Sequence, residues 1–243
     1  MHHVLDKAEV CLKKGQLQPT NFLDPYTVKV AFDILKGIQE VAFLSWGGYQ
    51  EAERKKIGIY PADLRFDKKE FSIALISFQG NFKFFENNHR HVLGALLASG
   101  IKRDKFGDIF IGDNQVQVIV DSKTTSYVVA NVVSIGPIPV VGEEKKIEDL
   151  LLPKSLFKEI RATVISMRLD AVLSAGFFVA RGKSAELIKK EKVKVNWQHI
   201  TRIDYQIEEG DILSVQGKGR IKVLEVLGTT RKDRIALKIG IYV

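Results

Sequence analysis

Residues 166–215 read SMRLDAVLSAGFFVARGKSAELIKKEKVKVNWQHITRIDYQIEEGDILSV, and this stretch decides the fold of the C-terminal part of the chain. Its first half predicts two short helices, because apolar side chains recur at helical spacing in residues 169–177 and again in residues 185–188. Ser166 is expected to cap the first helix. The strand signals that follow predict a twisted β-layer packed on this helix pair.

The strands expected after the helix pair are short and are separated by turn residues such as Gly and Asp. They are residues 193–195, 202–206, 212–215, 221–226 and 235–241. In the first of them charged and apolar residues alternate, so Lys192 and Lys194 are expected on the face opposite the core.

The positive charge of the chain is concentrated in this C-terminal part. The 243 residues contain 37 Lys and Arg against 29 Asp and Glu, a net charge of +8. Residues 1–153 contain 19 of each kind, so residues 154–243 hold the whole excess. A concentrated positive field attracts a polyanion, and nucleic acid is the expected partner through its phosphates. An anionic membrane surface is a weaker alternative, because the helices lack a broad apolar face that would insert.

The spacing of fourteen residues in this stretch resembles the S4 RNA-binding domain. The matching residues are Arg168, Leu169, Asp170, Leu173, Gly176, Arg181, Ala185, Leu187, Ile188, Val193, Val195, Asn196, Gly210 and Asp211. Three positions depart from the pattern: Ala180 replaces a Ser, and Glu191 and Trp197 stand where Gly is usual. The resemblance implies an RNA-binding module.

The resemblance and the basic pattern together predict an RNA-binding surface on the helix pair and the adjoining strands. An Arg can grip a phosphate with two parallel donors, whereas a Lys acts as a point charge. The candidate residues are Arg168, Arg181, Lys183, Ser184, Lys189, Lys190, Lys192, Lys194, Asn196, Arg202, Lys218 and Arg220. Three of them, Lys183, Lys189 and Lys190, are expected to share one solvent side of the second helix. For Lys218 and Arg220 an ordinary hairpin turn is the equal alternative.

Upstream, residues 71–140 predict the order strand, helix, strand, strand, helix, strand, which is that of a ferredoxin-like α/β sandwich. The expected strands are 71–79, 108–111, 115–120 and 132–141, and the expected helices are 89–99 and 122–131. RNA-recognition motifs share this topology. No aromatic pair stands at their strand spacing, however, so the topology alone predicts no RNA site. Residues 142–155 are expected to form a polar connector.

The whole chain is therefore predicted to be α+β with three parts. Residues 1–68 form a helical N-terminal region, mostly helix over residues 3–43, with a break at 18–21 and a candidate strand at 42–46. Residues 69–152 form a ferredoxin-like or RRM-like domain. Residues 153–243 form the S4 RNA-binding domain.

Three upstream segments extend the resemblance to nearly the whole chain. Residues 22–25 (FLDP), 58–61 (GIYP) and 89–108 (HRHVLGALLASGIKRDKFGD) are similar to YlmH-type S4 proteins, a family whose cyanobacterial and plastid members are called photosystem II S4 domain proteins. The family implies RNA binding on the large ribosomal subunit, rRNA or tRNA, and ribosome-associated quality control of stalled peptidyl-tRNA. It also favours a second RNA surface at Arg90, Lys102, Arg103 and Lys105, although these residues would equally solvate a helix end.

Other kinds of site are not expected. His89 and His91 point about 200° from each other on a helix, so they cannot share a metal ion. The single Cys11 excludes an internal disulfide and any Cys-based zinc site. No apolar run approaches the roughly 20 residues that span a bilayer, and residues 1–18 do not read as a signal peptide. We therefore expect no metal, no cofactor and no membrane partner.

The leading expectation is a non-catalytic, monomeric RNA-binding protein of the cytoplasm, or of the plastid stroma for a plant relative without its transit peptide. Two alternatives stay open. Arg168-Leu169-Asp170 is similar to the catalytic motif of pseudouridine synthases, which would make the chain an RNA-modifying enzyme, but too little chain follows for a synthase domain. Alternatively, the S4 domain would tether a scaffold whose neutral residues 1–153 bind a protein.

A cluster of aromatic residues is the remaining candidate for contact with RNA bases. Phe78, Phe82, Phe84 and Phe85 would stack on bases if they were exposed. Such clusters more often belong to the core, which is the preferred interpretation.

Overall fold

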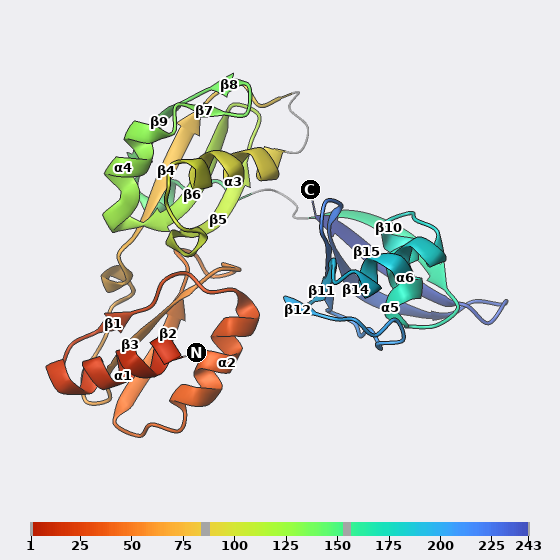
Figure 1. The fold of residues 1–243 in the computed structure, drawn as a ribbon, viewed down its shortest axis with the longest axis horizontal. Coiled ribbons are helices and arrows are strands. Elements are labelled where there is room, and N and C mark those ends of the chain that lie inside the picture. Colours follow the sequence, from red (N-terminus) through yellow and green to blue (C-terminus); the bar gives the residue numbers. More distant parts are fainter. Residues whose placement is uncertain (1, 84–87, 153–156, 243) are drawn as a thin grey trace. The chain divides into compact units, whose positions relative to one another are not determined.

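In the computed structural model, which describes residues 2–83, 88–152 and 157–242, the chain divides into two units (Figure 1). Unit 1 is Met1–Pro153 and unit 2 is Lys154–Val243. Each unit has its own core of buried apolar side chains.

The N-terminal part of unit 1 packs two helices against a small sheet. The helices are α1 (His2–Lys14) and α2 (Pro25–Leu35), and the strands are β1 (Gln18–Pro19), β2 (Val41–Trp46) and β3 (Lys56–Pro61), in the antiparallel order β1-β3-β2. The Asp24 side chain caps α2 by accepting a 2.9 Å hydrogen bond from the Thr27 N–H. The expected helices are thus present, and β2 confirms the candidate strand at residues 42–46. Strands β1 and β3 were not predicted, because β1 is two residues long and β3 contains Gly58 and Pro61.

The second part of unit 1 has the expected ferredoxin-like sandwich. Its sheet has the antiparallel order β5-β6-β4-β9, and α3 and α4 cover one face (Figure 1). The elements are η1 (Lys68–Phe71), β4 (Ile73–Gln79), α3 (Asn88–Ala98), η2 (Arg103–Lys105), β5 (Phe106–Ile111), β6 (Gln115–Asp121), η3 (Ser122–Thr124), α4 (Thr125–Asn131), β7 (Ser134–Ile135), β8 (Ile138–Pro139), β9 (Val141–Lys145) and η4 (Ile147–Asp149).

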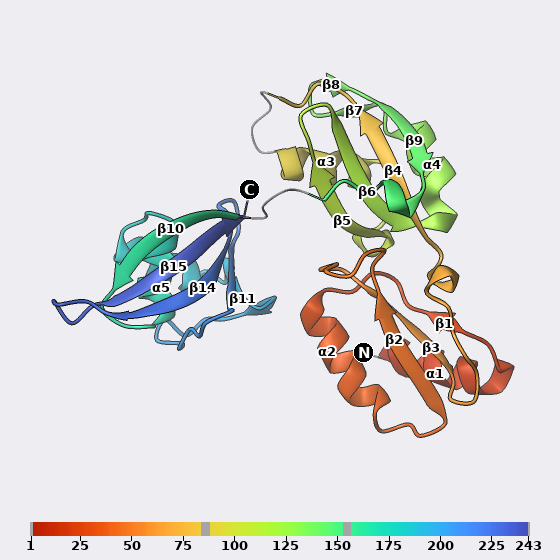
Figure 2. The ribbon, with the colours of Figure 1, turned by 180° about the vertical axis from the view of Figure 1, so that it is seen from behind.

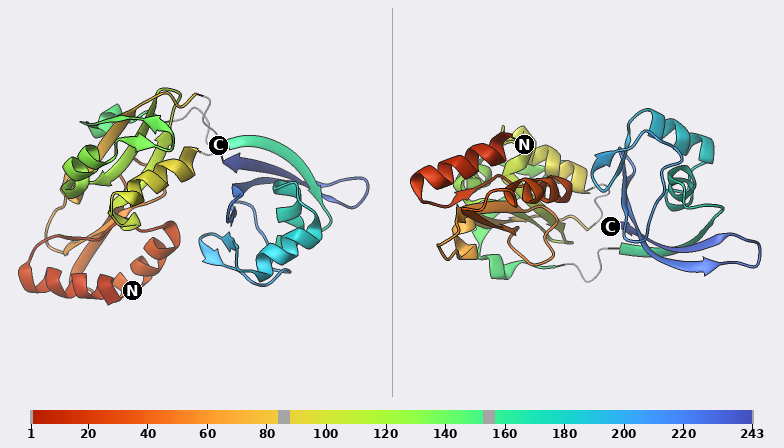
Figure 3. Two further views of the ribbon diagram at one scale, coloured as in Figure 1. Left: turned by 45° about the horizontal axis from the view of Figure 1, so that its top comes forward. Right: turned by 90° about the horizontal axis from the view of Figure 1, so that it is seen from below.

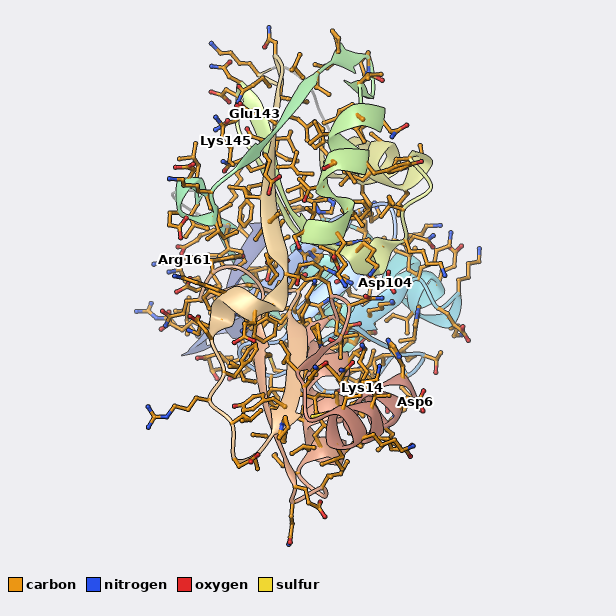
Figure 4. The ribbon with its side chains drawn as sticks, turned by 90° about the vertical axis from the view of Figure 1, so that its left-hand side faces the viewer. Asp6, Lys14, Asp104, Glu143, Lys145 and Arg161 are labelled. Carbon is orange, nitrogen blue, oxygen red and sulfur yellow. The ribbon has the colours of Figure 1, made fainter. Side chains whose placement is uncertain are left out.

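The last strand of this sheet lies later in the sequence than expected. Within residues 132–140 only the small hairpin β7-β8 forms, and β9, which pairs with β4, begins at Val141 and continues into the stretch that was expected to be a connector. The reason is that β9 is an exposed edge strand with sequence VGEEK, in which Glu143 and Lys145 pair at 2.8 Å in solvent (Figure 4). Such a strand has no apolar alternation for a sequence pattern to detect. Residues 153–155 of the expected connector lie outside the described part of the chain.

The second face of this sheet is covered by the chain itself. Leu75 and Ile119 are fully buried there beneath Phe22, with Tyr49 and Ile147 packed around them. Farther along the same face the sheet carries polar side chains, since Gln117 bonds to the backbone of Asp149 and Leu151. The aromatic rings on this face, Phe110 of β5 and Tyr49, pack edge-to-face against each other with centroids 5.4 Å apart.

The two parts of unit 1 are joined by a buried ion pair. The Lys56 Nζ atom donates to the Asp121 carboxylate at 3.0 Å and also to the carbonyl oxygens of Phe71 and Ser72. Lys105 reaches the same carboxylate at 3.3 Å. Burial would raise the pKa of Asp121, but the hydrogen bond and charge of Lys56 outweigh it and hold that pKa below its usual value. The carboxylate thus stays ionised inside the junction.

Unit 2 is a two-layer domain, with a helix pair on one side of a six-stranded antiparallel sheet (Figure 3). The sheet order is β10-β15-β14-β13-β11-β12. The elements are β10 (Phe157–Val164), α5 (Leu169–Gly176), α6 (Arg181–Lys189), β11 (Val193–Val195), β12 (Gln198–His199), β13 (Ile212–Val215), β14 (Gly219–Thr229) and β15 (Ile235–Tyr242). The expected S4 architecture is confirmed.

Two details of unit 2 differ from expectation for one shared reason. Residues 202–206 are not a strand, and Ser166 does not cap α5. Instead, the carbonyl oxygens of Ile203 and Tyr205 accept hydrogen bonds from the first N–H groups of α5, those of Asp170 and Leu169. The segment thus caps the helix with its backbone, and this long-range contact leaves no local sequence signal.

Strand β10 was not predicted from the sequence, although it pairs with β15 over eight residues. Its inward side chains Ile160, Ala162 and Val164 alternate with polar ones. This period of two is the signal that would have identified it.

Candidate nucleic-acid interface

The centre of the candidate site is one carboxylate held between two arginines. Asp170 lies in the first turn of α5 and accepts from the Arg168 Nε atom at 3.1 Å and from the Arg181 Nε atom at 2.9 Å. The Asp170 side chain is 7% exposed, whereas those of Arg168 and Arg181 are 35% and 48% exposed. The carboxylate is therefore inside the surface and the two guanidinium groups lie at it.

This geometry follows from the helix pair. Arg168 is the N-cap residue of α5 and Arg181 is the first residue of α6, so the two helix starts bring both side chains to Asp170. Burial would raise the pKa of Asp170, but the hydrogen bonds from Arg181 and Arg168 outweigh it, and the pKa lies below its usual value. Asp170 thus remains a negative charge that orients both arginines.

The arrangement leaves the outer edges of both arginines available. Each bonds Asp170 through Nε, and within the described part of the chain the terminal nitrogens of Arg168 and Arg181 make no hydrogen bond. Those nitrogens are the donors with which a guanidinium grips a phosphate.

Helix α6 adds lysines to this surface. Lys183 and Lys190 lie on one side of the helix, because both bind Glu186, at 2.8 Å and 2.7 Å. Their hydrogen bonds lower the pKa of Glu186 to about 2. Lys189 is also exposed but points about 100° away from Lys190 around the helix axis. The expectation of one shared side therefore holds for Lys183 and Lys190 and not for Lys189.

Two candidate residues have internal roles instead of facing solvent. Ser184 is fully buried inside the domain. Asn196 donates to the Asp211 carboxylate at 2.7 Å and accepts from the Ile212 N–H at 3.0 Å. As placed, neither side chain presents its polar group to RNA.

The departures from the S4 pattern have a visible backbone consequence. Asn196 and Trp197 both have positive φ, 46° and 67°, in the two-residue turn between β11 and β12. Glu191 has φ 56° directly after α6, where its N–H and that of Lys192 donate back to Ile188 and Leu187. Trp197 and Glu191 thus occupy the left-handed conformation that Gly adopts without strain.

The remaining candidates of unit 2 do not share one face. Lys194 and Arg220 lie on the outer face of the sheet, because the residues beside them, Val193, Val195 and Ile221, are buried under the helices. The other three, Lys192, Arg202 and Lys218, are exposed in connections between elements. The predicted single surface is therefore divided between the helix side (Figure 1) and the sheet side (Figure 2).

One residue on the helix side was not among the candidates. Phe178, between α5 and α6, is 74% exposed and has φ 53°. A large aromatic side chain held in solvent on a strained backbone, three residues before Arg181, is suited to stacking on a base. Its exposure has no signature in the sequence, where Phe177-Phe178 reads as the end of an apolar stripe.

In unit 1 the four predicted residues of a second RNA surface separate into two pairs. Arg90 and Lys102 are exposed. Arg103 donates to the carbonyl oxygens of Phe106 and Gly107, and Lys105 bonds to Asn21 and Asp121. The second pair is thus engaged in holding η2 and the junction together.

The remaining expectations from the sequence concern the aromatic cluster, metal sites and membrane spans. Phe78 and Phe82 are buried, in agreement with the core interpretation, and Phe84 and Phe85 lie outside the described residues. Within the described residues no cluster of three His, Cys, Asp or Glu side chains has the geometry of a metal site. In the same part of the chain no helix is long and apolar enough to cross a membrane.

A groove of about 640 Å³ lies between α3 and α4. Its lining includes Arg90, His91 and Tyr127, and none of the described residues in it is a carboxylate.

Comparison with known families and proteins agrees with this geometry. Residues 1–64 match the family model "YlmH, N-terminal", residues 67–149 match "Putative RNA-binding domain in YlmH", and residues 167–213 match "S4 domain". A solved structure described as cell division protein ylmH from Streptococcus pneumoniae superposes with a TM-score of 0.52 at 25% identity, covering 62% of this chain and 94% of that one.

Two curated proteins are similar in sequence. An uncharacterized RNA pseudouridine synthase of Aquifex aeolicus (strain VF5) is 36% identical over 52 residues, which is 21% of this chain and 22% of that protein. Ribosome-associated protein quality control protein P2 of Bacillus subtilis (strain 168) is 35% identical over 231 residues, covering 95% of this chain and 89% of that protein. With its RNA-binding S4 domain and this full-length similarity, the chain belongs to the YlmH family.

Proposed function

We propose that this protein is a non-catalytic RNA-binding factor of the cytoplasm that associates with the large ribosomal subunit. Its S4 unit contacts structured RNA, rRNA or bound tRNA, and the protein acts in translation or in the quality control of stalled ribosomes. It works as a monomer, with parts at residues 1–68, 69–152 and 153–243. The observation that carries the proposal is the Arg168–Asp170–Arg181 arrangement on the surface of a unit with net charge +8.

The electrostatics of the two units support this assignment. Unit 1 is neutral as a whole, so long-range attraction of RNA comes from unit 2. There, two oriented guanidinium groups supply directional donors, while Lys183 and Lys190 supply charge. Their pairing with Glu186 is solvent-exposed and weak, so a phosphate competes with it readily.

The test is co-sedimentation with ribosomes from lysate at low and at high salt. The wild-type protein is expected with large subunits at low salt and to be released by high salt, since phosphate contacts release counterions. Arg181→Ala combined with Lys183→Ala is expected to abolish the association while the circular dichroism spectrum stays unchanged. Lys14→Ala with Lys29→Ala, two exposed lysines of unit 1, is the charge-matched control and is expected to sediment like wild type.

A correctly folded Arg181/Lys183 variant that still sediments with large subunits would refute the assignment of the RNA site to the helix side of unit 2. Wild-type protein that stays at the top of the gradient at both salt concentrations would remove the ribosomal assignment and favour the scaffold alternative. A pull-down after nuclease treatment, which leaves only protein-mediated contacts, then tests that alternative.

A further inference from the structure

The outer face of the unit 2 sheet, on the side away from the helices, carries a second set of cations. One row crosses five strands. Lys194 stands beside Ser214, and Ser214 stands beside Arg220. The Arg220 guanidinium lies 4.4 Å from the centre of the Tyr242 ring, and Tyr242 stands beside Phe157. Residues directly opposite each other on paired strands share a face, so these five side chains form one continuous line.

Two further rows run parallel to the first. Their members are Lys222, Gly240 and Glu159 in one row and Glu225, Lys238 and Arg161 in the other. Arg161 projects from β10 into solvent (Figure 4). Lys238 pairs with Glu159 at 2.9 Å, so this carboxylate is already compensated. Among the described residues this face carries five cations, Arg161, Lys194, Arg220, Lys222 and Lys238, and two carboxylates, Glu159 and Glu225.

The aromatic end of the first row depends on a glycine in the neighbouring strand. The Phe157 and Tyr242 rings are 4.7 Å apart in an edge-to-face arrangement. A Cβ atom on Gly240 would lie 2.8 Å from the Phe157 ring, so only Gly leaves room for that ring on the sheet surface. Planar rings next to Arg and Lys side chains are the components of surfaces that bind single-stranded nucleic acid.

We infer that this outer sheet face, defined by Arg161, Lys194, Arg220, Lys222, Lys238, Tyr242 and Phe157, binds a single-stranded RNA segment, separately from the helix-side site. The inference rests on the proposed RNA-binding function and adds a second contact to it. Neighbouring strands lie about 4.8 Å apart, so Lys238 and Arg161 are adjacent, whereas Lys194 and Arg220 are about 10 Å apart with Ser214 between them, and successive rows lie about 7 Å apart. A flexible strand can follow this grid with its phosphates while unpaired bases reach the rings. A partner protein with an acidic surface is the competing occupant.

The experiment compares two probes with the full-length protein. One is a fluorescein-labelled twelve-nucleotide oligouridine, which stays single-stranded, and the other is a labelled RNA hairpin of similar length. Lys194→Gln with Lys222→Gln removes two cations of the sheet face, and Arg181→Ala with Lys183→Ala removes the helix-side contacts. Lys14→Gln with Lys29→Gln, in unit 1, is the charge-matched control. The quantity measured is the dissociation constant by fluorescence anisotropy at several salt concentrations.

The sheet-face variant is expected to bind oligouridine about tenfold more weakly, with a salt slope smaller by about 1.4, because each lost phosphate contact on a single strand accounts for about 0.7. Its hairpin affinity is expected to change less than twofold, and the helix-side variant is expected to show the reverse. Tyr242→Leu, which keeps an apolar side chain on the sheet, is expected to weaken oligouridine binding about tenfold with no change in salt slope.

The opposite results separate the two proposals. If only the helix-side variant weakens both probes, the sheet-face site is refuted and the proposed function stands. If the sheet-face variant weakens oligouridine while the helix-side variant changes neither probe, the sheet face is supported and the helix-side assignment fails. Wild-type protein that binds neither probe at low salt, or oligouridine binding that the sheet-face and control variants reduce equally, refutes the sheet-face site.

Discussion

Asp121 in unit 1 and Asp170 in unit 2 each hold two cationic side chains, yet the two arrangements do different work. Around Asp121, the Lys56 side chain is only 2% exposed. Its ammonium group therefore binds partners inside the junction between the two sheets and not at the surface. Around Asp170, both arginines are at least one-third exposed. The carboxylate is buried in both places, and the exposure of its cations decides whether the cluster is a structural lock or a binding site.

The chemistry of the cations strengthens the contrast. Lys56 fills its three donor positions with Phe71, Ser72 and Asp121, which suits a compact ammonium group. An arginine has five donors, so Arg168 and Arg181 can each give one to Asp170 and keep others for a ligand. The same charge pattern therefore closes one site and leaves the other open.

The largest expected effect comes from breaking the lock. Lys56→Met leaves Asp121 buried with only the more distant Lys105, and we expect unit 1 to lose about 3 kcal/mol of unfolding free energy. Urea unfolding followed by Trp46 fluorescence in a Trp197→Phe background measures this, since Trp46 belongs to unit 1. Hairpin RNA binding at low urea is expected to stay within twofold of wild type. A loss below 1 kcal/mol would mean that the junction does not depend on this pair.

Asp170→Asn tests the open cluster in the same way. It replaces charge-assisted hydrogen bonds by weaker ones, and we expect unit 2 to lose about 2 kcal/mol at pH 7. Because the folded pKa of Asp170 lies below its unfolded value near 4, its stabilisation is present above about pH 4 and is lost as the pH falls through the folded pKa. The difference between wild type and variant should therefore shrink on acidification. Unfolding curves from Trp197 fluorescence in a Trp46→Phe background, recorded at pH 7 and pH 3, measure this difference. The same difference in unfolding free energy at both pH values would contradict the prediction.

Phe178→Ala removes the exposed ring beside the open cluster without touching a charge. We expect RNA affinity to fall about tenfold with an unchanged salt slope, which is the signature of lost stacking. Stability should not decrease, because the ring is in solvent. Anisotropy titrations at three salt concentrations measure the effect, and Phe178→Tyr, which keeps a ring, is the control. An RNA affinity unchanged within twofold would show that the Phe178 ring does not contact RNA.

The smallest expected effect is an increase in the stability of unit 2. Glu191→Gly relieves the left-handed backbone at the end of α6 and should stabilise unit 2 by about 1 kcal/mol. It also removes a negative charge close to the basic surface, so RNA affinity should rise slightly at low salt and not at high salt. Thermal unfolding and anisotropy test both parts, and a lower melting temperature would show that the Glu side chain makes a compensating contribution.

The sequence anticipated much of this molecule where signals are local. The helix pair, strands 193–195 and 212–215, and the order of the ferredoxin-like sandwich follow from periodicity and turn residues. Strand β9 and the capping segment 202–206 were missed because their roles depend on partners far away in the chain. Of the candidate site residues, Ser184 is buried in the core, and Asn196, which matches the family spacing, uses its side chain to bond Asp211 and Ile212.

The sequence by itself determined that the chain belongs with S4-containing proteins and that its positive charge sits in the last 90 residues, since composition and spacing are properties of the chain alone. Only the tertiary structure decided how that charge is used. It placed Asp170 between two arginines, paired Lys183 and Lys190 with Glu186, and sent Lys194 and Arg220 to the opposite face of the sheet. The physical reason is that exposure and pairing arise from the packing of layers, which brings together residues that no local pattern connects.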